Sequence, residues 1–192
     1  MAVDFVEKSF QLSDGSAVKC FIYDTAGQER YNSINESYYK NTNGILLVYD
    51  ISNKESFEKI ENYYCPKIEE YSKKNIPIIL LGNKADKENE RQVSIEEGAN
   101  LAVEYKFKFK ETSCLKNENV ADAFEDLIEM WNDEYIKTKE LEERGVYYGR
   151  GQVLLMQKLR DIELQKRINK IYLMAKYNSF IFNIFYISYF NF

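Results

Sequence analysis

The stretch that decides the fold is Tyr23–Tyr31, "YDTAGQERY". It continues from an apolar run, "VKCFIYD", and it carries Asp24, Gly27 and Gln28 close together. An acidic side chain, a residue without a Cβ and an amide at the end of a strand can hold a metal-bound phosphate and orient a water molecule. The alternating segment "DFVEKSFQL" and the turn around Gly15 predict a β-hairpin that ends at Asp24.

Two further apolar runs predict buried parallel strands, because a strand covered on both faces is continuously apolar. They are "GILLVYD" (Gly44–Asp50) and "IPIILLGNK" (Ile76–Lys84). We expect a helix between them, in which Ser52 and Glu55 form a capping box and Pro66 causes a kink or break. Strands that alternate with helices predict an α/β fold, with a mostly parallel sheet and helices on both faces.

The alternation continues in the second half of the chain. Ser94 and Glu97 fit a second capping box, "KFKFKETS" predicts a strand, and Asn119 is expected to cap a last helix. The inward face of that last helix is predicted to carry Phe124, Leu127, Ile128 and Trp131.

Three polar turns follow the predicted strands. They are Asp24, Asn83–Asp86 and Thr112–Cys114. Because ligands of open α/β sheets bind at the carboxyl ends of the strands, we expect these turns to converge on one edge.

Composition excludes several classes of function. The 192 residues carry a net charge of −5 and no histidine, which argues against a nucleic-acid groove binder and excludes histidine chemistry. The three cysteines, Cys20, Cys65 and Cys114, are widely spaced, so buried cytosolic thiols are favoured over disulfides or a zinc site. The N-terminus resembles neither a signal sequence nor a transit peptide.

The character of the chain changes after Lys137. We expect an α/β domain over residues 1–137, a linker over 138–151, and an atypical helix with an aromatic low-complexity tail over 152–192. The tail "KYNSFIFNIFYISYFNF" is shorter than the ~18–20 apolar residues that span a bilayer, and it is β-prone and nearly uncharged. Since its residues are those of A/T-only codons, translated non-coding sequence is an alternative interpretation of the tail.

Three motifs carry a resemblance to a known family. "DTAGQER" (Asp24–Arg30), "NKAD" (Asn83–Asp86) and "ETSCLK" (Glu111–Lys116) resemble the small GTPases in order and spacing. The segments "AVDF", "QERYNSI" and "YYKNTNGILLVYDISNKESFEKI" resemble the Rab family within the Ras superfamily. The similarity covers about residues 2 to 137 and implies a P-loop NTPase-like G domain.

The resemblance assigns roles on the phosphate side of a GTP site. Asp24 would hold Mg²⁺ through a water molecule, and the backbone N–H of Gly27 would face the terminal phosphate. Gln28 would be the catalytic residue, because it would orient the attacking water.

The resemblance also assigns roles on the base side. Asn83 would bond the edge of the base, Lys84 would lie along the ring, and Asp86 would accept hydrogen bonds from guanine. Ser113 would support Asp86, and the backbone N–H of Cys114 would bond the guanine carbonyl. Cys114 and Leu115 stand where the family usually carries alanine and frequently carries lysine, but both contacts are mainly made by backbone.

Two parts of the family pattern do not occur in this sequence. None of the eight glycines opens a G-x-x-x-x-G-K-[ST] P-loop, and Met1 falls just past the position of switch I. The first strand, the P-loop and the first helix are therefore expected to be missing. In the family that strand lies between those ending here at Asp24 and Asp50, so we expect two unpaired edges in the core. No cysteine follows Cys114, so we also expect the family's usual prenyl anchor to be missing.

The leading hypothesis is a GTP-hydrolysing Rab-like switch in vesicle traffic, which uses GTP/GDP and Mg²⁺. The resemblance implies partners of three kinds, effectors, exchange factors and GTPase-activating proteins, bound through residues 4–38, and a location in the cytoplasm or on endomembranes. Nucleic acid is not an expected partner. The alternative is a non-catalytic Rab-derived binding module, or a truncated gene model, that binds GTP weakly and competes for Rab partners. A third idea is that the aromatic tail fills the slot of the missing strand or inserts into a membrane.

Overall fold

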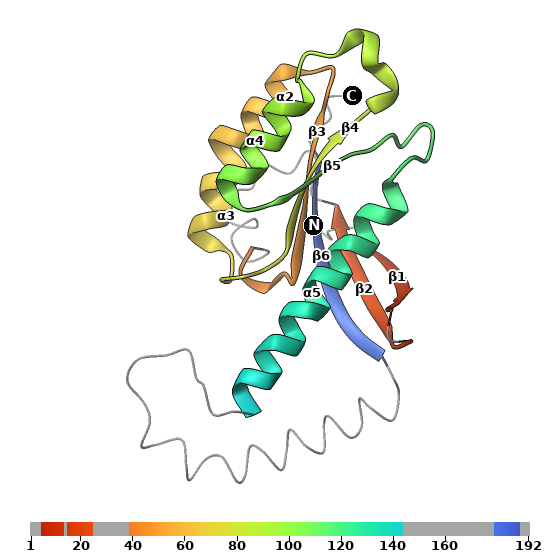
Figure 1. The fold of residues 1–192 in the computed structure, drawn as a ribbon, viewed down its shortest axis with the longest axis vertical. Coiled ribbons are helices and arrows are strands. Elements are labelled where there is room, and N and C mark those ends of the chain that lie inside the picture. The colour runs from red at the N-terminus through yellow and green to blue at the C-terminus, as the bar shows by residue number, and fades with distance from the viewer. Residues whose placement is uncertain (1–4, 14, 25–38, 144–178, 189–192) are drawn as a thin grey trace.

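The computed structural model describes residues 5–13, 15–24, 39–143 and 179–188. They form a six-stranded sheet in the order β1-β2-β6-β3-β4-β5 (Figure 1). Only β1 and β2 pair antiparallel, and all other neighbours pair parallel. The expected α/β fold with a mostly parallel sheet is confirmed.

The N-terminal hairpin is formed by β1 (Phe5–Gln11) and β2 (Ala17–Asp24). Gly15, with φ of 85°, supplies the left-handed conformation that the tight turn requires. The Ser16 carbonyl accepts a hydrogen bond from Leu12 N at 2.8 Å across that turn. The predicted hairpin that ends at Asp24 is therefore present.

The other half of the sheet contains β3 (Gly44–Asp50), β4 (Ile78–Asn83) and β5 (Lys108–Glu111). All residues of β3 and β4 are buried, as continuous apolar runs predict. The register pairs Asp50 with Asn83, and Gly82 with Glu111. The carboxyl ends of these strands therefore lie at one edge of the sheet.

The central strand is β6 (Ser179–Ser188), which comes from the aromatic tail. It pairs parallel with β2 on one side and with β3 on the other (Figure 1). The expected pair of unpaired edges in the core is thus wrong, because the tail occupies the slot between them. The atypical helix expected at the start of residues 152–192 lies outside the described residues.

The segment after β3 contains α2 (Lys54–Lys59), a π-helical turn η1 (Ile60–Tyr64) and α3 (Cys65–Tyr71). Pro66 stands in the first turn of α3. A proline there needs no intrahelical N–H partner, and the wider π turn before it absorbs the ring, so the predicted interruption is confirmed.

The predicted capping box at Ser52 is wrong. The N-cap of α2 is Asn53, whose side chain accepts from Ser56 N at 3.2 Å. Ser52 instead donates from its N–H and hydroxyl to Asp50 Oδ1, at 2.8 and 2.7 Å. A contact with a carboxylate outcompetes the capping position because the acceptor is charged.

The helix α4 (Ile95–Tyr105) begins with the predicted capping box, in which Glu97 N donates to Ser94 Oγ and Ser94 N donates to Glu97 Oε2. The helix α5 spans Val120–Glu143 and so continues past the boundary expected at residue 137. Asn119 has a left-handed φ of 58° and donates from Nδ2 to the Glu111 carbonyl, so its predicted side-chain cap is wrong.

Helices cover both faces of the sheet, with α2, α3 and α4 on one side and α5 on the other (Figure 1). The α5 face buries Leu127 and Ile128 and packs Phe124 and Trp131 beside them, as the periodicity predicts. Within the described residues, no helix is both long and apolar enough to cross a bilayer.

Candidate functional site

Asn83 occupies the last position of β4 and organises the carboxyl edge of the sheet. Its buried side chain accepts two hydrogen bonds at Oδ1, from Cys114 N at 3.2 Å and from Thr112 Oγ1 at 3.3 Å. Its carbonyl accepts from Ile51 N at 3.0 Å. The turns after β3 and β5 therefore meet at one residue, Asn83, through its carbonyl and its side chain, and the predicted convergence of Asn83 with Thr112–Cys114 is confirmed.

Lys84 leaves β4 in a left-handed conformation, with φ of 63° and ψ of 38°. Its Nζ lies 2.7 Å from Oδ2 of the buried Asp50 at the end of β3. Burial raises the pKa of Asp50, but hydrogen bonds from Lys84 and Ser52 outweigh that effect and hold the pKa below its ordinary value. Asp50 thus stays ionised and anchors the ammonium group, a partner that the sequence analysis did not assign.

Asp86 follows within the 3-10 helix η2 (Ala85–Glu90). Its Oδ1 accepts a hydrogen bond from the fully buried Ser113 hydroxyl, and Ser113 Oγ accepts in turn from Lys116 N at 3.1 Å. Within the described ranges, no hydrogen bond engages the second carboxylate oxygen of Asp86, Oδ2. Ser113 therefore holds the Asp86 carboxylate in place at Oδ1, while Oδ2 is available to accept hydrogen bonds.

Cys114 and Leu115 are exposed on the turn after β5, and the Leu115 side chain retains 84% of its exposure. The backbone N–H of Cys114 is directed to Asn83 rather than left open. Cys20 and Cys65 are buried free thiols, and burial raises the pKa of each to about 12. These two cysteines are therefore unreactive buried thiols, as expected, whereas the expectation of a buried thiol is wrong for Cys114.

A cavity of about 180 Å³ adjoins this edge on the α5 side of the sheet. Asn83, Thr112 and Cys114 border it together with apolar side chains of the strands and of α5, among them Val48, Leu81 and Phe124. Ligand pockets in proteins usually measure roughly 300–1,000 Å³. This cavity is therefore smaller than a usual ligand pocket, and neither Lys84 nor Asp86 lines it.

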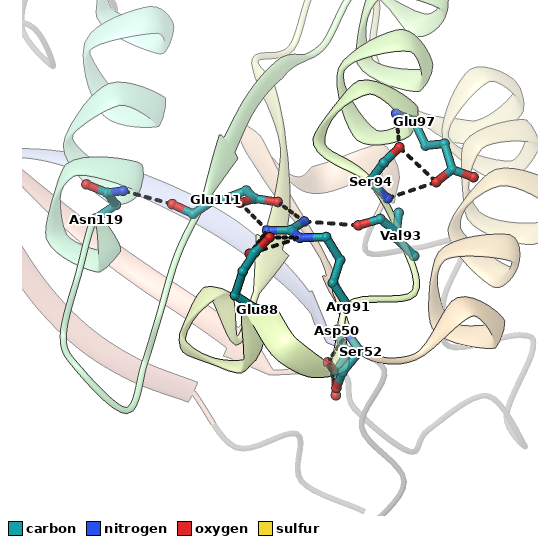
Figure 2. A network of polar contacts seen from close by, with 9 residues as sticks. All are labelled: Asp50, Ser52, Glu88, Arg91, Val93, Ser94, Glu97, Glu111 and Asn119. Atoms are coloured by element: carbon teal, nitrogen blue, oxygen red, sulfur yellow. Dashed lines mark hydrogen bonds and ion pairs between the residues drawn. The ribbon is translucent and has the colours of Figure 1, made fainter.

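A second group of polar contacts joins η2 to the end of β5 (Figure 2). Arg91 donates to both oxygens of Glu111, at 2.6 and 2.9 Å, and to both oxygens of Glu88. Asn119 Nδ2 donates to the Glu111 carbonyl at 2.9 Å from the other side. Because Glu88 lies in η2 and Glu111 ends β5, the Arg91 contacts hold η2, which carries Asp86, against the end of β5. No local motif in the sequence marks Arg91.

The phosphate side of the predicted site is described only in part. Asp24 ends β2 at the same edge of the sheet, since β2, β6 and β3 run parallel. The side chain of Asp24, together with Gly27 and Gln28, lies outside the described residues. In the described part of the chain, no three His, Cys, Asp or Glu side chains gather as metal ligands.

A comparison with protein families gives the class of protein. The Ras family model matches residues 1–133, and the chain therefore belongs to the Ras family.

Curated relatives give a finer similarity. Human Ras-related protein Rab-8B is 44% identical over 124 residues, which cover 65% of this chain and 59% of that relative. Mouse Ras-related protein Rab-8A is 45% identical and chicken Rab-8A 44% identical, with the same coverage. The chain thus spans about three fifths of the length of these relatives.

Proposed function

We propose that this chain is a Rab-like protein whose carboxyl-edge site recognises the guanine base of GTP and GDP. The observation that carries the proposal is the carboxylate of Asp86, which Ser113 holds at one oxygen while the other is open. Guanine presents two adjacent donors, an imino N–H and an amino group, that a carboxylate can accept. Adenine presents an acceptor at the corresponding ring nitrogen, which would leave the carboxylate unpaired.

The neighbouring residues support the same ligand. Asn83 Oδ1 accepts a hydrogen bond from the backbone N–H of Cys114, which holds the turns after β4 and β5 together beside Asp86. Lys84, anchored by Asp50, would present its aliphatic stem to one face of the ring. Leu115, on the turn after β5, would contact the nucleotide mainly through its backbone.

On the phosphate side, we propose the roles that the Rab resemblance gives. Asp24 would hold Mg²⁺ through water, Gly27 would approach the terminal phosphate, and Gln28 would orient the water that hydrolyses GTP. Bound Mg²⁺ would neutralise phosphate charge. Since no P-loop pattern occurs within residues 1–192, we expect the polypeptide of these residues to bind GTP weakly, and nanomolar affinity would contradict this expectation.

Base selectivity tests the proposal directly. In Asp86→Asn the carboxylate becomes an amide, whose NH₂ can donate to the carbonyl that xanthine carries in place of the guanine amino group. We expect guanosine diphosphate to bind the variant at least tenfold more weakly and xanthosine diphosphate to bind it more tightly, measured by calorimetry. Asp133→Asn, on the exposed side of α5, is the matched control and should change neither affinity. Equal binding of adenosine and guanosine diphosphates to the parent chain would refute the proposed base site.

A second candidate function is a nucleotide-independent binding module. The favouring observation is β1, which pairs only with β2 among the described strands and exposes 64% of Val6. The surface formed by residues 4–38, which include this hairpin, would bind effectors or regulators of Rab proteins on endomembranes. A pull-down with a Rab effector, with and without GTP, separates the two functions, because binding that ignores GTP favours the module.

A further inference from the structure

The strand β6 joins two parts of the sheet that have no direct pairing with each other. In the described sheet, β2 and β3 each pair with β6 and not with one another. Among the described strands, the hairpin that leads to Asp24 is therefore connected by backbone hydrogen bonds to β3, β4 and β5 only through β6.

The register shows how completely β6 fills the position. The whole of β2, Ala17–Asp24, pairs with Ser179–Tyr186. On the other side Gly44–Val48 pairs with Ile184–Ser188. The residues from Ile184 to Tyr186 are paired on both sides, which is the condition of an interior strand.

The surroundings explain why this position must be filled. The facing strands bury Val18 and Cys20 on one side and Leu46 and Val48 on the other, with at most 1% exposure. Backbone N–H and C=O groups at such a depth need partners, because water cannot reach them. An empty slot would leave two facing rows of unpaired groups inside the core.

The sequence of β6, "SFIFNIFYIS", fits an interior parallel strand. It combines β-branched and aromatic residues, it carries no charge, and it contains no proline that would interrupt the ladder. The composition that marks an exposed segment as an aggregation hazard is the composition that a strand buried on both faces requires.

We propose that the gap between β2 and β3 is a strand-binding site, and that its ligand is the segment Ser179–Ser188 of the same molecule. The site takes an extended, uncharged peptide that runs parallel to both neighbours. Occupation of the site makes the C-terminal segment an integral part of the domain, and it couples the hairpin that ends at Asp24 to the half of the sheet that carries Asn83.

A native thiol makes the register testable. Cys20 is paired with Phe182, and neighbouring strands lie ~4.8 Å apart, within the Cα separation of about 4.4–6.8 Å that a disulfide needs. Positions paired across two strands share a face of the sheet, whereas the next position along a strand lies on the opposite face. Phe182→Cys should therefore cross-link to Cys20, and Asn183→Cys should not.

The experiment uses the full chain with Cys114→Ser, which removes the exposed thiol. After mild oxidation, we expect the Phe182→Cys protein to remain a monomer. It should yield at least tenfold more of the peptide linked between positions 20 and 182 than the Asn183→Cys protein yields between positions 20 and 183. Equal cross-linking in both variants would overturn the register, and disulfide-linked dimers would overturn binding within one molecule.

A measurement on the unsubstituted chain covers the case in which a variant fails to fold. Amide hydrogen exchange should show residues 181–187 protected at least 100-fold relative to an unstructured peptide, at rates similar to those of Leu46–Val48 in β3. Exchange of residues 181–187 at unstructured rates, while β3 stays protected, would overturn the proposal.

Discussion

Gly98 in α4 lies directly against Tyr49 of β3, and we predict that Gly98→Ala destabilises the protein. A Cβ at position 98 would lie 2.5 Å from Tyr49 Oη and 2.7 Å from Cε2 and Cζ of Phe109. Tyr49 is fully buried and cannot move aside without displacing other core residues. The new methyl group therefore forces either α4 or β3 to shift.

The expected magnitude combines two opposing effects. Overpacking of a well-packed core costs about 1–3 kcal/mol, and three overlapping contacts in a fully buried place favour the upper part of that range. Alanine is favoured over glycine inside a helix by about 1 kcal/mol. We therefore expect the free energy of unfolding to fall by about 1–2 kcal/mol.

Tyr49→Phe provides a second perturbation of the same contact. In the described residues, Tyr49 Oη is a buried oxygen without a hydrogen-bond partner. Removal of an unsatisfied buried hydroxyl relieves a desolvation penalty of about 1–3 kcal/mol, partly offset by the small cavity left behind. We expect Tyr49→Phe to be neutral or stabilising. It should also relieve part of the cost of Gly98→Ala, with a coupling of about 1 kcal/mol, because the clash with Phe109 remains.

The parent protein, the two single variants Gly98→Ala and Tyr49→Phe, and the double variant form a double-mutant cycle. The free energy of unfolding of each is measured by urea unfolding, followed by the fluorescence of the single tryptophan, Trp131. Asn100→Ala, at an exposed position of α4, reports the gain in helix propensity alone. A Gly98→Ala protein that is as stable as the parent, or effects of the two substitutions that simply add, would refute the reasoning.

Three further predictions concern the site and its supports. Ser113→Ala should raise the Kd for guanosine diphosphate about tenfold, because Asp86 loses its buried donor, and unchanged affinity in calorimetry would contradict this role. Arg91→Ala should lower the free energy of unfolding in urea by about 1–3 kcal/mol, since its paired carboxylates lose their donors; an effect below 0.5 kcal/mol, roughly that of an ordinary surface change, would argue against the bridge. Hydrogen bonds from Lys54 and from the helix cap lower the pKa of Glu97 to about 2, so its contribution to stability is complete above pH about 4.5 and disappears as the pH falls toward 2. A carboxyl titration of Glu97 by NMR with a midpoint near 4.5 would show that these contacts do not form in solution.

Sequence patterns correctly predicted those helix ends and interruptions that depend only on residues close by in the chain. The capping box of Ser94 and Glu97 and the interruption at Pro66 depend on neighbours within one helical turn, and both are present. The N-caps expected at Ser52 and Asn119 failed because each side chain has a competing partner, two residues away for Ser52 and eight residues away for Asn119. Ser52 contacts Asp50, and Asn119 contacts the Glu111 carbonyl. A sequence pattern cannot rank such competing acceptors.

The residues of the candidate site that stand directly after predicted strands could be placed from the sequence. Asn83, Asp86 and Ser113 converge because parallel strands deliver their carboxyl ends to one edge. The contacts of Lys84 with Asp50 and of Arg91 with Glu111 join residues far apart in the chain, and no spacing rule indicates them.

The position of β6 has a consequence for how the two halves of the site depend on each other. Asp50, which anchors Lys84, ends β3, and β3 is held by β4 on one side and by β6 on the other. Asp24 ends β2, which β6 holds from the opposite side. A displacement of β6 would therefore loosen the hairpin that ends at Asp24 more than the base-recognising turns, because β3 keeps its pairing with β4 whereas the hairpin loses its backbone link to the rest of the sheet. The base side and the phosphate side are thus expected to differ in their sensitivity to the C-terminal segment, with the Asn83 turn the more independent of the two.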